Sequence, residues 1–560
     1  MKELKNKIFP YVLQNAVFYN GKAELGSVLG KVLGENPELR KQVPEVKKNV
    51  ENLVKEINKL SLEEQKSQLE KLNPKMLEKE EKKEEKKLPE LPGIKEKIVM
   101  RMAPNPNGPL HIGHCRMAIL NDEYTKKYGG TLLLRFDDTD PKNENKIPML
   151  EAYNWIQEDL KWLGVKYDRV ERASDRLDVY YSYFKQFLER GFVYVCLCEQ
   201  EVWSKMVREQ RKECPCRKND FQKNLDNWEK MLAGEFKEGQ AVGRIRADFK
   251  KEKNPAVLDW VAFRIIDNPQ HPLVKKFKVW PTLDFASSID DKEFAITHII
   301  RGKDLASSEE KQLILYKYLG WRYPITKVYG KFMTSENLVI SKSKIQEGIK
   351  SGLYTGYDDP KLVFLKALRR RGIHPQAIRN YILNLGLSEA ETTVDLDILY
   401  SENRKITDPG ANRYMIVLDP YKIEIEDAPE IKQIEVERHP DDPKAGKKIV
   451  TVSKTIFVSK DDFNQFTRKV VRLKGLFNVK LENKSPYKGN ELERGMQRLQ
   501  WVSGPNVKVR IVFPDKTVEG LGEPEVGKLK VGQIIQMERI GYGRVDKVEK
   551  DMVTIYFSHK

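Results

Sequence analysis

The stretch RMAPNPNGPLHIGH, residues 101–114, holds two histidines and two glycines at a spacing that suits phosphate chemistry. His111 and His114 fall on the expected first turn of a helix, where backbone amides point at a bound anion. Gly108 and Gly113 remove side chains where a phosphate or an adenine must come close. The imidazoles would stabilise charge on a pentavalent α-phosphate without acting as bases. The alternative is a pair of helix-start histidines that make only local hydrogen bonds.

A second basic loop, NLVISKSKI at residues 337–345, follows about 230 residues later. Its two lysines and two serines within five positions suit a clamp on a triphosphate. Lys342 would neutralise charge at the transition state and on the leaving pyrophosphate. Considered alone, the loop is equally typical of a solvated charged surface.

These residues need a framework that places a loop at the end of a strand. Residues 98–103 (IVMRMA) predict a short strand, residues 111–130 a helix ended by two glycines, and residues 131–138 (TLLLRFDD) a second strand. This order indicates a parallel, doubly wound sheet, which binds nucleotides at the carboxyl ends of its strands. Further strands are predicted in KFKVWPTLDFASSID (276–290) and AITHIIRGKD (295–304).

The pattern of apolar, charged and turn-forming residues divides the chain into four regions. Residues 1–92 predict a helical extension that ends in the charged linker EKEEKKEEKK and the turn-rich LPELPG. Residues 93–330 predict the nucleotide-binding domain, interrupted by a mixed insert at about 195–275. Residues 331–405 are again helical in pattern, whereas residues 406–560 alternate like β-barrels or sandwiches.

Composition narrows the functional class. Lysine and arginine number 100 against 83 acidic residues, a formal net charge of +17, which favours a polyanionic partner such as nucleic acid, although a solvated lysine-rich surface would give the same total. No apolar run of about 18 residues is present, so we expect no membrane span. The N-terminus lacks the apolar core of a signal peptide, and five cysteines in 560 residues do not make a disulfide framework. We therefore expect a cytoplasmic protein.

Four of the five cysteines form two close pairs in the insert. Cys196 and Cys198 are followed by Cys214 and Cys216. Paired thiolates at this spacing can close a tetrahedral Zn²⁺ site, although C-x-C is tighter than the usual C-x₂-C. The alternative is a set of free thiols. Cys115, on the histidine helix, is interpreted as a core residue.

Together, PNPNGPLHIGH and VISKSK resemble the two signatures of class I aminoacyl-tRNA synthetases, in the family's order and separation. Val339 stands where that family usually has the first lysine of its second signature. Of the two lysines that this signature usually has, only Lys342 is therefore matched with certainty. The resemblance implies ATP binding by Pro104, Asn105, Gly108, His111, Gly113, His114, Ile340, Ser341, Lys342 and Ser343.

Two further motifs narrow the resemblance to the glutamyl and glutaminyl subfamily. LLLRFDDTDP (132–141) and WPTLDFASSIDD (280–291) with THIIRGKD look like that subfamily, and the β-rich second half is similar to its archaeal and eukaryotic branch. The implied fold is a Rossmann-type α/β catalytic domain split by an acceptor-binding insert. A helical stem-contact region and C-terminal all-β anticodon-binding barrels would follow it.

A glutamate pocket needs an anion for the substrate's ammonium and cations for its two carboxylates. Asp137 at the end of the second strand is the candidate anion, and Arg101 and Arg301 are the candidate cations, because an arginine fork pairs with a carboxylate through two hydrogen bonds. Tyr180 and Ser287 are further pocket candidates. Surface ion pairs are the alternative for any single one of these residues.

Arg301 also bears on the choice between amino acids. Glutaminyl enzymes resembling this chain usually have an uncharged residue at that position, so Arg301 favours glutamate. The family's tyrosine in PTY is replaced here by Leu283, which removes one hydroxyl contact.

The reaction that the resemblance implies has two steps: L-glutamate and ATP, with Mg²⁺, give glutamyl-adenylate, and the glutamyl group then passes to the 3′ end of tRNA(Glu). The sequence leaves open whether tRNA(Gln) is also charged, and whether residues 1–92 dock a protein partner or pack on the body. The alternatives are a glutaminyl-tRNA synthetase, a non-catalytic tRNA-binding paralogue, and a small-molecule nucleotidyltransferase that shares the histidine loop.

Overall fold

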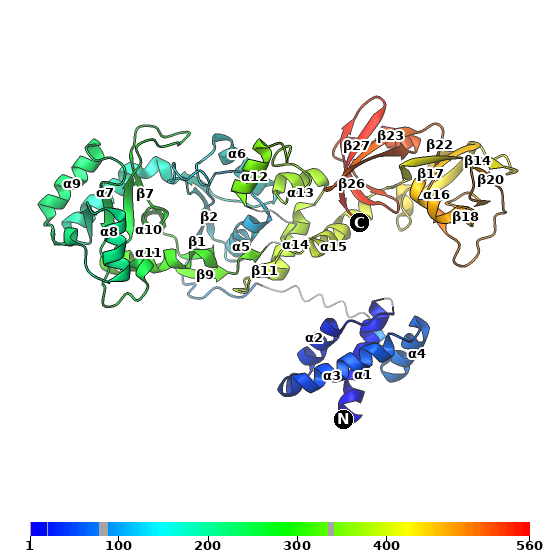
Figure 1. Ribbon diagram of the computed structural model, residues 1–560, viewed down its shortest axis with the longest axis horizontal. Coiled ribbons are helices and arrows are strands. Elements are labelled where there is room, and N and C mark those ends of the chain that lie inside the picture. The colour runs from blue at the N-terminus through cyan, green and yellow to red at the C-terminus, as the bar shows by residue number, and fades with distance from the viewer. Residues whose placement is uncertain (1, 20, 78–87, 334–340) are drawn as a thin grey trace. The chain divides into compact units, whose positions relative to one another are not determined.

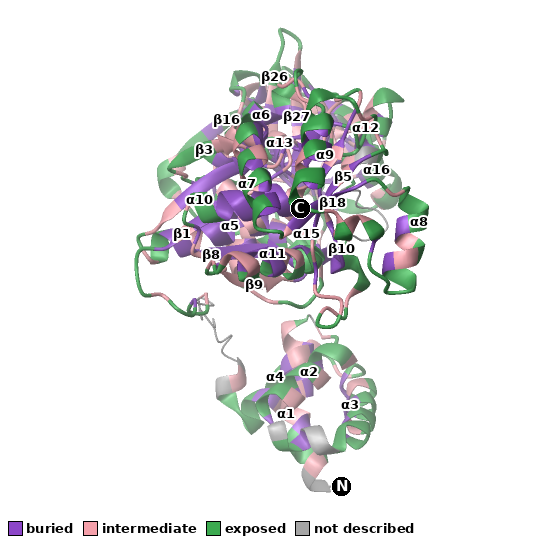
Figure 2. Cartoon of the chain, turned by 90° about the vertical axis from the view of Figure 1, so that its left-hand side faces the viewer, coloured by how far each residue is buried: buried purple, intermediate pink, exposed green. Residues whose placement is uncertain are grey.

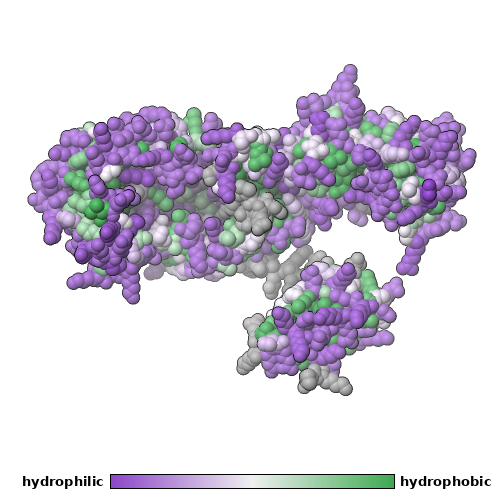
Figure 3. All heavy atoms as spheres, viewed as in Figure 1, coloured by the Kyte–Doolittle hydropathy of each residue, from purple (hydrophilic) through white to green (hydrophobic). Residues whose placement is uncertain are grey.

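The computed structural model describes residues 2–19, 21–77, 88–333 and 341–560 (Figure 1). The chain divides into two compact units, Met1–Lys87 and Leu88–Lys560. The predicted charged linker at 78–87 lies outside the described residues, as do Val339 and Ile340. In the described part of the chain, no helix is long and apolar enough to cross a membrane. The face shown in Figure 3 is mostly hydrophilic, as the high content of charged residues leads one to expect.

The first unit is helical, which confirms the prediction for the N-terminal region. Its helices are α1 (Lys2–Phe18), α2 (Leu25–Glu35), α3 (Val43–Ile57) and α4 (Leu62–Leu72). Val46, Val50, Leu53 and Ile57 share one face of α3 and are fully buried, because their spacing matches the helical period. A capping box between Ser61 and Glu64 satisfies backbone amides where α4 begins.

The second unit is built on a parallel sheet. Its first strands are β1 (Val99–Met102), β2 (Thr131–Phe136) and β3 (Arg169–Arg172), paired in that order, with α5 (Ile112–Lys127) connecting β1 to β2 and α6 (Leu150–Trp162) preceding β3. The helix α5 is largely buried (Figure 2). The predicted strand–loop–helix–strand order is therefore confirmed, and it places the histidine loop at the carboxyl end of β1.

A second pair of parallel strands follows about 200 residues later and contacts β1. The strands β8 (His298–Gly302) and β9 (Ile325–Tyr329) pair in parallel, with α11 (Ala306–Leu319) between them. Val99 donates its backbone N–H to Thr297 Oγ1 at 2.9 Å, and Thr297 donates its N–H back to the Val99 carbonyl. Residues 298–302 were predicted as a strand, and that prediction is confirmed.

The prediction of a strand over residues 276–290 is largely wrong. Only β7 (Val279–Pro281) is extended, and the segment that follows is the helix α10 (Leu283–Glu293). The alternation of apolar and polar residues around Trp280 suggested a strand. The residues Phe285, Ala286 and Ile289 instead pack on one helical face and are fully buried.

Between the two sets of parallel strands the chain forms an antiparallel sheet with helices. The strands β4 (Val193–Cys196), β5 (Val242–Ile245), β6 (Val261–Ile265) and β7 pair in sequence order. The helices are α7 (Leu177–Glu189), α8 (Gln200–Ser204) and α9 (Phe221–Ala233). Aromatic contacts among Phe184, Trp228 and Phe263 fill the core between α7, α9 and this sheet.

Helices return after the second pair of parallel strands. They are α12 (Lys342–Lys350), α13 (Leu365–Arg371), α14 (Pro375–Leu385) and α15 (Leu396–Thr407), with the short parallel pair β10 (Phe332–Met333) and β11 (Thr392–Thr393). Buried side chains join these helices to the end of the chain. Arg371 donates to the carbonyls of Phe557 and Ser558, and Asn403 lies 2.9 Å from the His559 ring nitrogen Nε2.

The C-terminal region is dominated by β-strands, as predicted. A seven-stranded mixed sheet contains, in order, β12 (Arg413–Tyr414), β25 (Ile534–Met537), β26 (Gly541–Val548), β27 (Met552–His559), β23 (Val507–Val512), β24 (Thr517–Gly522) and β13 (Ile416–Leu418). A second, four-stranded sheet contains β20 (Lys484–Pro486), β14 (Pro420–Glu426), β17 (Thr455–Ser459) and β22 (Val502–Ser503), with α16 (Lys460–Phe466) following β17. Smaller sheets pair β15 (Gln433–Glu437) with β16 (Lys447–Thr451), and β18 (Val470–Leu473) with β19 (Asn478–Lys480) and β21 (Arg498–Leu499).

Two adjacent aspartates on α10 join this helix to the strands β1 and β2. Asp291 accepts two hydrogen bonds from Arg101 of β1, at 2.9 and 3.0 Å. Asp290 accepts from Arg135 of β2 at 2.5 Å, and also from Arg176 and the Tyr180 hydroxyl. Asp290 and the Arg135 side chain are fully buried, so their ion pair compensates two charges that are removed from water. Arg176 is a second cation beside Asp290, and Asp137 is a second anion beside Arg135.

We predict that Asp290→Asn destabilises the Leu88–Lys560 unit by about 3–5 kcal/mol, because it removes the 2.5 Å ion pair of the buried Arg135 and leaves this arginine only Asp137, at 3.3 Å, as an anionic partner. Urea unfolding followed by tryptophan fluorescence measures the effect. The control is Asp175→Asn, which removes an exposed ion pair with Arg172 and should change stability by no more than about 1 kcal/mol. Equal unfolding midpoints for the Asp290 variant and the unmodified protein would contradict the prediction.

Candidate active site

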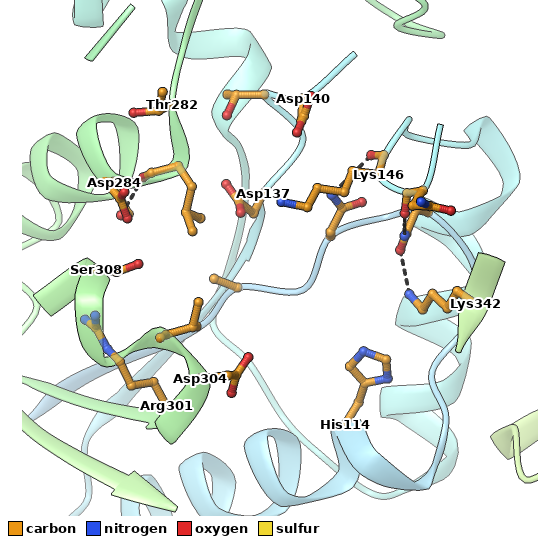
Figure 4. Close-up of a pocket in the computed structure, with 18 of the residues that line it drawn as sticks. His114, Asp137, Asp140, Lys146, Thr282, Asp284, Arg301, Asp304, Ser308 and Lys342 are labelled. Carbon is orange, nitrogen blue, oxygen red and sulfur yellow. Dashed lines mark hydrogen bonds between the residues drawn. The ribbon is translucent and has the colours of Figure 1, made fainter. Parts of the chain in front are cut away.

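A cavity of about 730 Å³ opens at the carboxyl ends of β1, β2 and β8. Figure 4 shows Asp284, Ser308 and Arg301 on one side of it and His114 and Lys342 on the other. The structure therefore brings described residues of both signatures and most of the predicted glutamate residues to one cavity. Arg101, Asn105, His111, Asp137, Ser287 and Ser341 also line it.

The rings of the two histidines form a close, tilted pair at the start of α5. Their ring centroids are 3.8 Å apart. His111 Nδ1 accepts the Gly113 N–H at 3.0 Å, and His114 Nδ1 accepts the His111 N–H at 3.2 Å. Burial lowers the pKa of His111 to about 3 and holds the pKa of His114 well below its usual range. Both rings are thus neutral at pH 7 and carry their proton on Nε2, where it can be donated to a phosphate oxygen.

The two glycines of this loop are required for different structural reasons. A β-carbon at Gly113 would lie 2.8 Å from the His111 ring, so this glycine makes room for the imidazole. Gly108 has a φ of +148°, a conformation that side chains rarely adopt, and it faces Lys342 and the Tyr357 hydroxyl. Pro104 accepts the Asp137 N–H through its carbonyl, which ties the loop to the end of β2.

Lys342 of the second signature contacts the histidine loop. Its Nζ donates to Asn107 Oδ1 at 2.7 Å, and burial lowers its pKa to about 7. Asn107 was not among the predicted residues, although its place in PNPNGP beside Gly108 was a signal. Ile340 and the side chain of Ser343 lie outside what the structure describes.

The two predicted substrate cations differ in their partners. Arg101 is already paired with Asp291, so its charge is compensated within the protein. Arg301 is 4% exposed and donates to Gln312 Oε1 from both Nη1 and Nη2, at 3.2 Å, and to the Tyr323 hydroxyl at 3.1 Å. Its Nε has no partner among the described residues. The guanidinium of Arg301 thus faces the cavity with neutral hydrogen-bond partners.

Asp137 and Tyr180 were both predicted to contact the substrate, but only Asp137 lies on the cavity wall. Asp137 lines the cavity and lies 3.3 Å from Arg135; burial raises its pKa from the usual value. Tyr180 is fully buried and donates to Asp290 at 2.6 Å, so the structure places it behind the site and not on the cavity wall. Leu283 does line the cavity where the family usually has a tyrosine.

Several cavity residues were missed by sequence reasoning. Asp284 pairs with Lys311 at 2.6 Å, and Asp140 pairs with Arg264 of β6 at 2.7 Å, across the contact between the sheet and the insert. Asp304 also lines the wall (Figure 4). Asp140 and Asp304 lie inside the motifs DDTDP and RGKD, and this position could have marked them as site residues. Arg264 lies in no motif that would have indicated a role in the site.

The four cysteines of the insert converge, away from this cavity. Cys214 Sγ lies 3.6 Å from both Cys196 Sγ and Cys198 Sγ, and Cys198 Sγ lies 3.8 Å from Cys216 Sγ. All four sulfur atoms are within 4.8 Å of one another. Zn–S bonds of about 2.3 Å at tetrahedral angles require sulfur–sulfur distances of about 3.8 Å, so the set fits Zn²⁺.

Comparison with known proteins identifies the family. The model for the catalytic domain of class I tRNA synthetases (E and Q) matches residues 97–407. Models for the anticodon-binding domain of the same synthetases match residues 411–498 and 498–546.

Curated relatives are similar along the whole chain. The glutamate–tRNA ligase of Archaeoglobus fulgidus is 45% identical, over 99% of this chain and 100% of that protein. The corresponding ligases of Thermococcus kodakarensis and Methanosarcina mazei are 44% and 41% identical, over 100% and 98% of each chain. The chain therefore belongs to the class I tRNA synthetases of the glutamyl and glutaminyl type, with an α/β catalytic domain and C-terminal anticodon-binding β domains, as its motifs predicted.

We predict that ATP binding takes up a proton through Lys342. In the free protein this lysine has a pKa of about 7, and a triphosphate beside it must raise that pKa. Uptake should be small at pH 6, where Lys342 is already protonated, and larger at pH 8, where the free lysine is mostly neutral. Calorimetry in buffers of different ionisation enthalpy measures it. The difference between pH 8 and pH 6 should vanish in Lys342→Met, and an unchanged difference would contradict the assignment.

Proposed function

We propose that this protein is a glutamate–tRNA ligase. Relatives with that activity match the full length of the chain. The observation that carries the choice of glutamate is Arg301, a buried guanidinium whose hydrogen-bond partners among the described residues, Gln312 and Tyr323, are neutral. A substrate carboxylate would compensate this charge, whereas the neutral amide of glutamine would leave it buried and unpaired, at a cost of several kcal/mol.

The cavity supports a two-step reaction. In the first step a carboxylate oxygen of glutamate attacks the ATP α-phosphorus, a P–O bond forms, and pyrophosphate leaves with the electrons of the broken bond. His111 and His114 donate Nε2–H to the α-phosphate oxygens, and Lys342 pairs with the leaving group. Mg²⁺ enters with ATP, held chiefly by phosphate oxygens and water. In the second step the terminal ribose hydroxyl of the tRNA attacks the acyl carbon and AMP leaves.

The glutamate is held by the opposite wall. Arg301 pairs with the side-chain carboxylate, and Asp137 accepts from the ammonium group. Because Asp291 already compensates Arg101, we assign Arg101 a weaker role than Arg301, through donors directed at the cavity. The Leu283 side chain gives this wall an apolar surface in place of a hydroxyl.

We assign tRNA contacts by region. The insert at about 195–275 would grip the acceptor end, the helices at 331–405 would touch the stem, and residues 406–560 would read the anticodon, in keeping with the family models for that region. Residues 93–330 outside the insert would form the catalytic domain. Exposed bases are read by stacking and edge hydrogen bonds. We propose tRNA(Glu) as the substrate, and the test below decides whether tRNA(Gln) is charged as well.

For residues 1–92 we propose a separate role. Met1–Lys87 forms its own compact unit, and its buried residues Val28, Val46, Leu53 and Leu69 belong to one core. A unit with its own core suits docking to a protein partner of the translation apparatus. Because tRNA charging serves protein synthesis, we propose a cytoplasmic location.

We further propose that the cysteine cluster holds a structural Zn²⁺. The donor set of four thiolates is the one that closed zinc sites use, and the sulfur–sulfur distances suit it. The cluster lies at the end of β4, so a bound metal would fix the loops 197–199 and 210–216 of the insert.

The zinc proposal predicts about one zinc per chain in the purified protein, measured by elemental analysis. Cobalt substitution should give the visible absorption of a tetrahedral thiolate site. Cys214→Ser should lose the metal, whereas the matched control Cys115→Ser should keep it, because Cys115 lies in the core on α5. A metal-free protein with four reactive thiols in the insert would overturn the proposal.

The functional proposal is tested by aminoacylation of purified tRNA(Glu) and tRNA(Gln) with each amino acid. We expect glutamate to be attached and glutamine to be refused. Arg301→Gln should lower kcat/KM for glutamate about tenfold to a hundredfold, since a hydrogen bond to a charged group is worth about 1.5–3 kcal/mol. The exposed Arg190→Gln is the control. Preferential charging with glutamine by the unmodified protein would refute the glutamate assignment.

A further inference from the structure

The side chain that holds Arg301 is the amide of Gln312. Gln312 lies on α11, is 1% exposed, and its Oε1 accepts from Arg301 Nη1, Arg301 Nη2 and the Tyr323 hydroxyl, the last at 2.6 Å. Its Nε2 donates to Ser287 Oγ at 2.7 Å. The amide is thus fixed at both ends, between α10 and the end of β8.

The orientation of this amide follows from the hydrogen bonds around it. The Ser287 hydroxyl donates to the Leu283 carbonyl at 2.7 Å, so Ser287 Oγ must accept from Gln312. The amide nitrogen therefore faces Ser287 and the oxygen faces Arg301. The reverse orientation would set N–H donors against the guanidinium and leave Ser287 without a donor.

The choice of a neutral acceptor is specific to Arg301. The other two arginines at this edge of the sheet have aspartate partners, Asp291 for Arg101 and Asp290 for Arg135. A glutamate at position 312 would have nearly the same shape as Gln312 and would form an ion pair with Arg301. Gln312 instead restrains the guanidinium and leaves its positive charge uncompensated.

We propose that Gln312 is the positioning residue for glutamate selectivity: it orients the Arg301 guanidinium toward the cavity while leaving its charge for the side-chain carboxylate of the substrate. Tyr323 supports the same arrangement, because its hydroxyl donates to Gln312 and accepts from Arg301. This inference rests on the proposed function and adds the means by which Arg301 is kept available. Gln312 acts through Arg301 and is assigned no part in the chemical step.

The test is Gln312→Glu, which adds a carboxylate at constant side-chain size. Steady-state aminoacylation of tRNA(Glu) should show a glutamate KM raised at least tenfold, with kcat within about threefold of the unmodified enzyme. The KM for ATP should not change, because the histidine and lysine side of the cavity is untouched. The ratio of kcat/KM for glutamate over glutamine should fall at least tenfold, since the built-in carboxylate repels one substrate and not the other.

A second variant separates charge from packing. Gln312→Met keeps the volume but removes the acceptor and adds no charge; we expect a glutamate KM raised about threefold to tenfold and a smaller loss of selectivity than in Gln312→Glu. Gln376→Glu, on the exposed first turn of α14, is the control for an added negative charge and should match the unmodified enzyme. Thermal unfolding of each variant checks folding.

The outcomes separate this inference from the functional proposal. If the unmodified enzyme charges glutamate and folded Gln312→Glu keeps both its glutamate KM and its selectivity within twofold, the role of Gln312 is refuted. If Gln312→Glu does not fold, the Met variant decides: unchanged KM and selectivity refute the inference. Failure of the unmodified enzyme to charge glutamate refutes the proposed function instead.

Discussion

The pairing of Asp290 and Asp291 with arginines from β1 and β2 is the constraint on which the rest of the catalytic unit depends. The parallel strands β1 and β8 lie about 200 residues apart in the chain, with the antiparallel sheet β4–β7 between them. Two neighbouring carboxylates on α10 pair with buried arginines of β1 and β2. An unpaired charge there is costly, so these ion pairs hold α10 against both strands.

The cationic side chains of the site differ in their partners. Aspartates compensate the charges of Arg101 and Arg135, whereas the hydrogen-bond partners of Arg301 are neutral. Burial lowers the pKa of Lys342 to about 7. Burial lowers the pKa of both histidines, so the rings are neutral hydrogen-bond donors and weak bases. The cavity thus has a cationic side chain on each of two sides. In the proposed function, Arg301 would bind a substrate carboxylate and Lys342 would bind phosphates, and the histidines would act as neutral donors.

Much of this architecture could be predicted from sequence because it follows from local patterns. The apolar run before PNPNGP, the helix after it and the second strand are each defined by short-range periodicity, and the loop between them is placed by the parallel order of the elements. The roles of Asp290 and Asp291 could not be predicted, since their partners lie more than 100 residues away in the chain. Tyr180 was assigned to the pocket by its motif, and only packing shows that its hydroxyl turns to Asp290. The helix at 283–293 was mistaken for the continuation of a strand, of which only Val279–Pro281 is extended.

The bond between Lys342 and Asn107 has a consequence for turnover. In the proposed reaction, a phosphate oxygen would compete with the amide oxygen of Asn107 for Lys342. Once pyrophosphate has left, Lys342 would return to Asn107, an acceptor on the neighbouring loop. Product release would then exchange one oxygen partner for another, which would lower its free-energy cost.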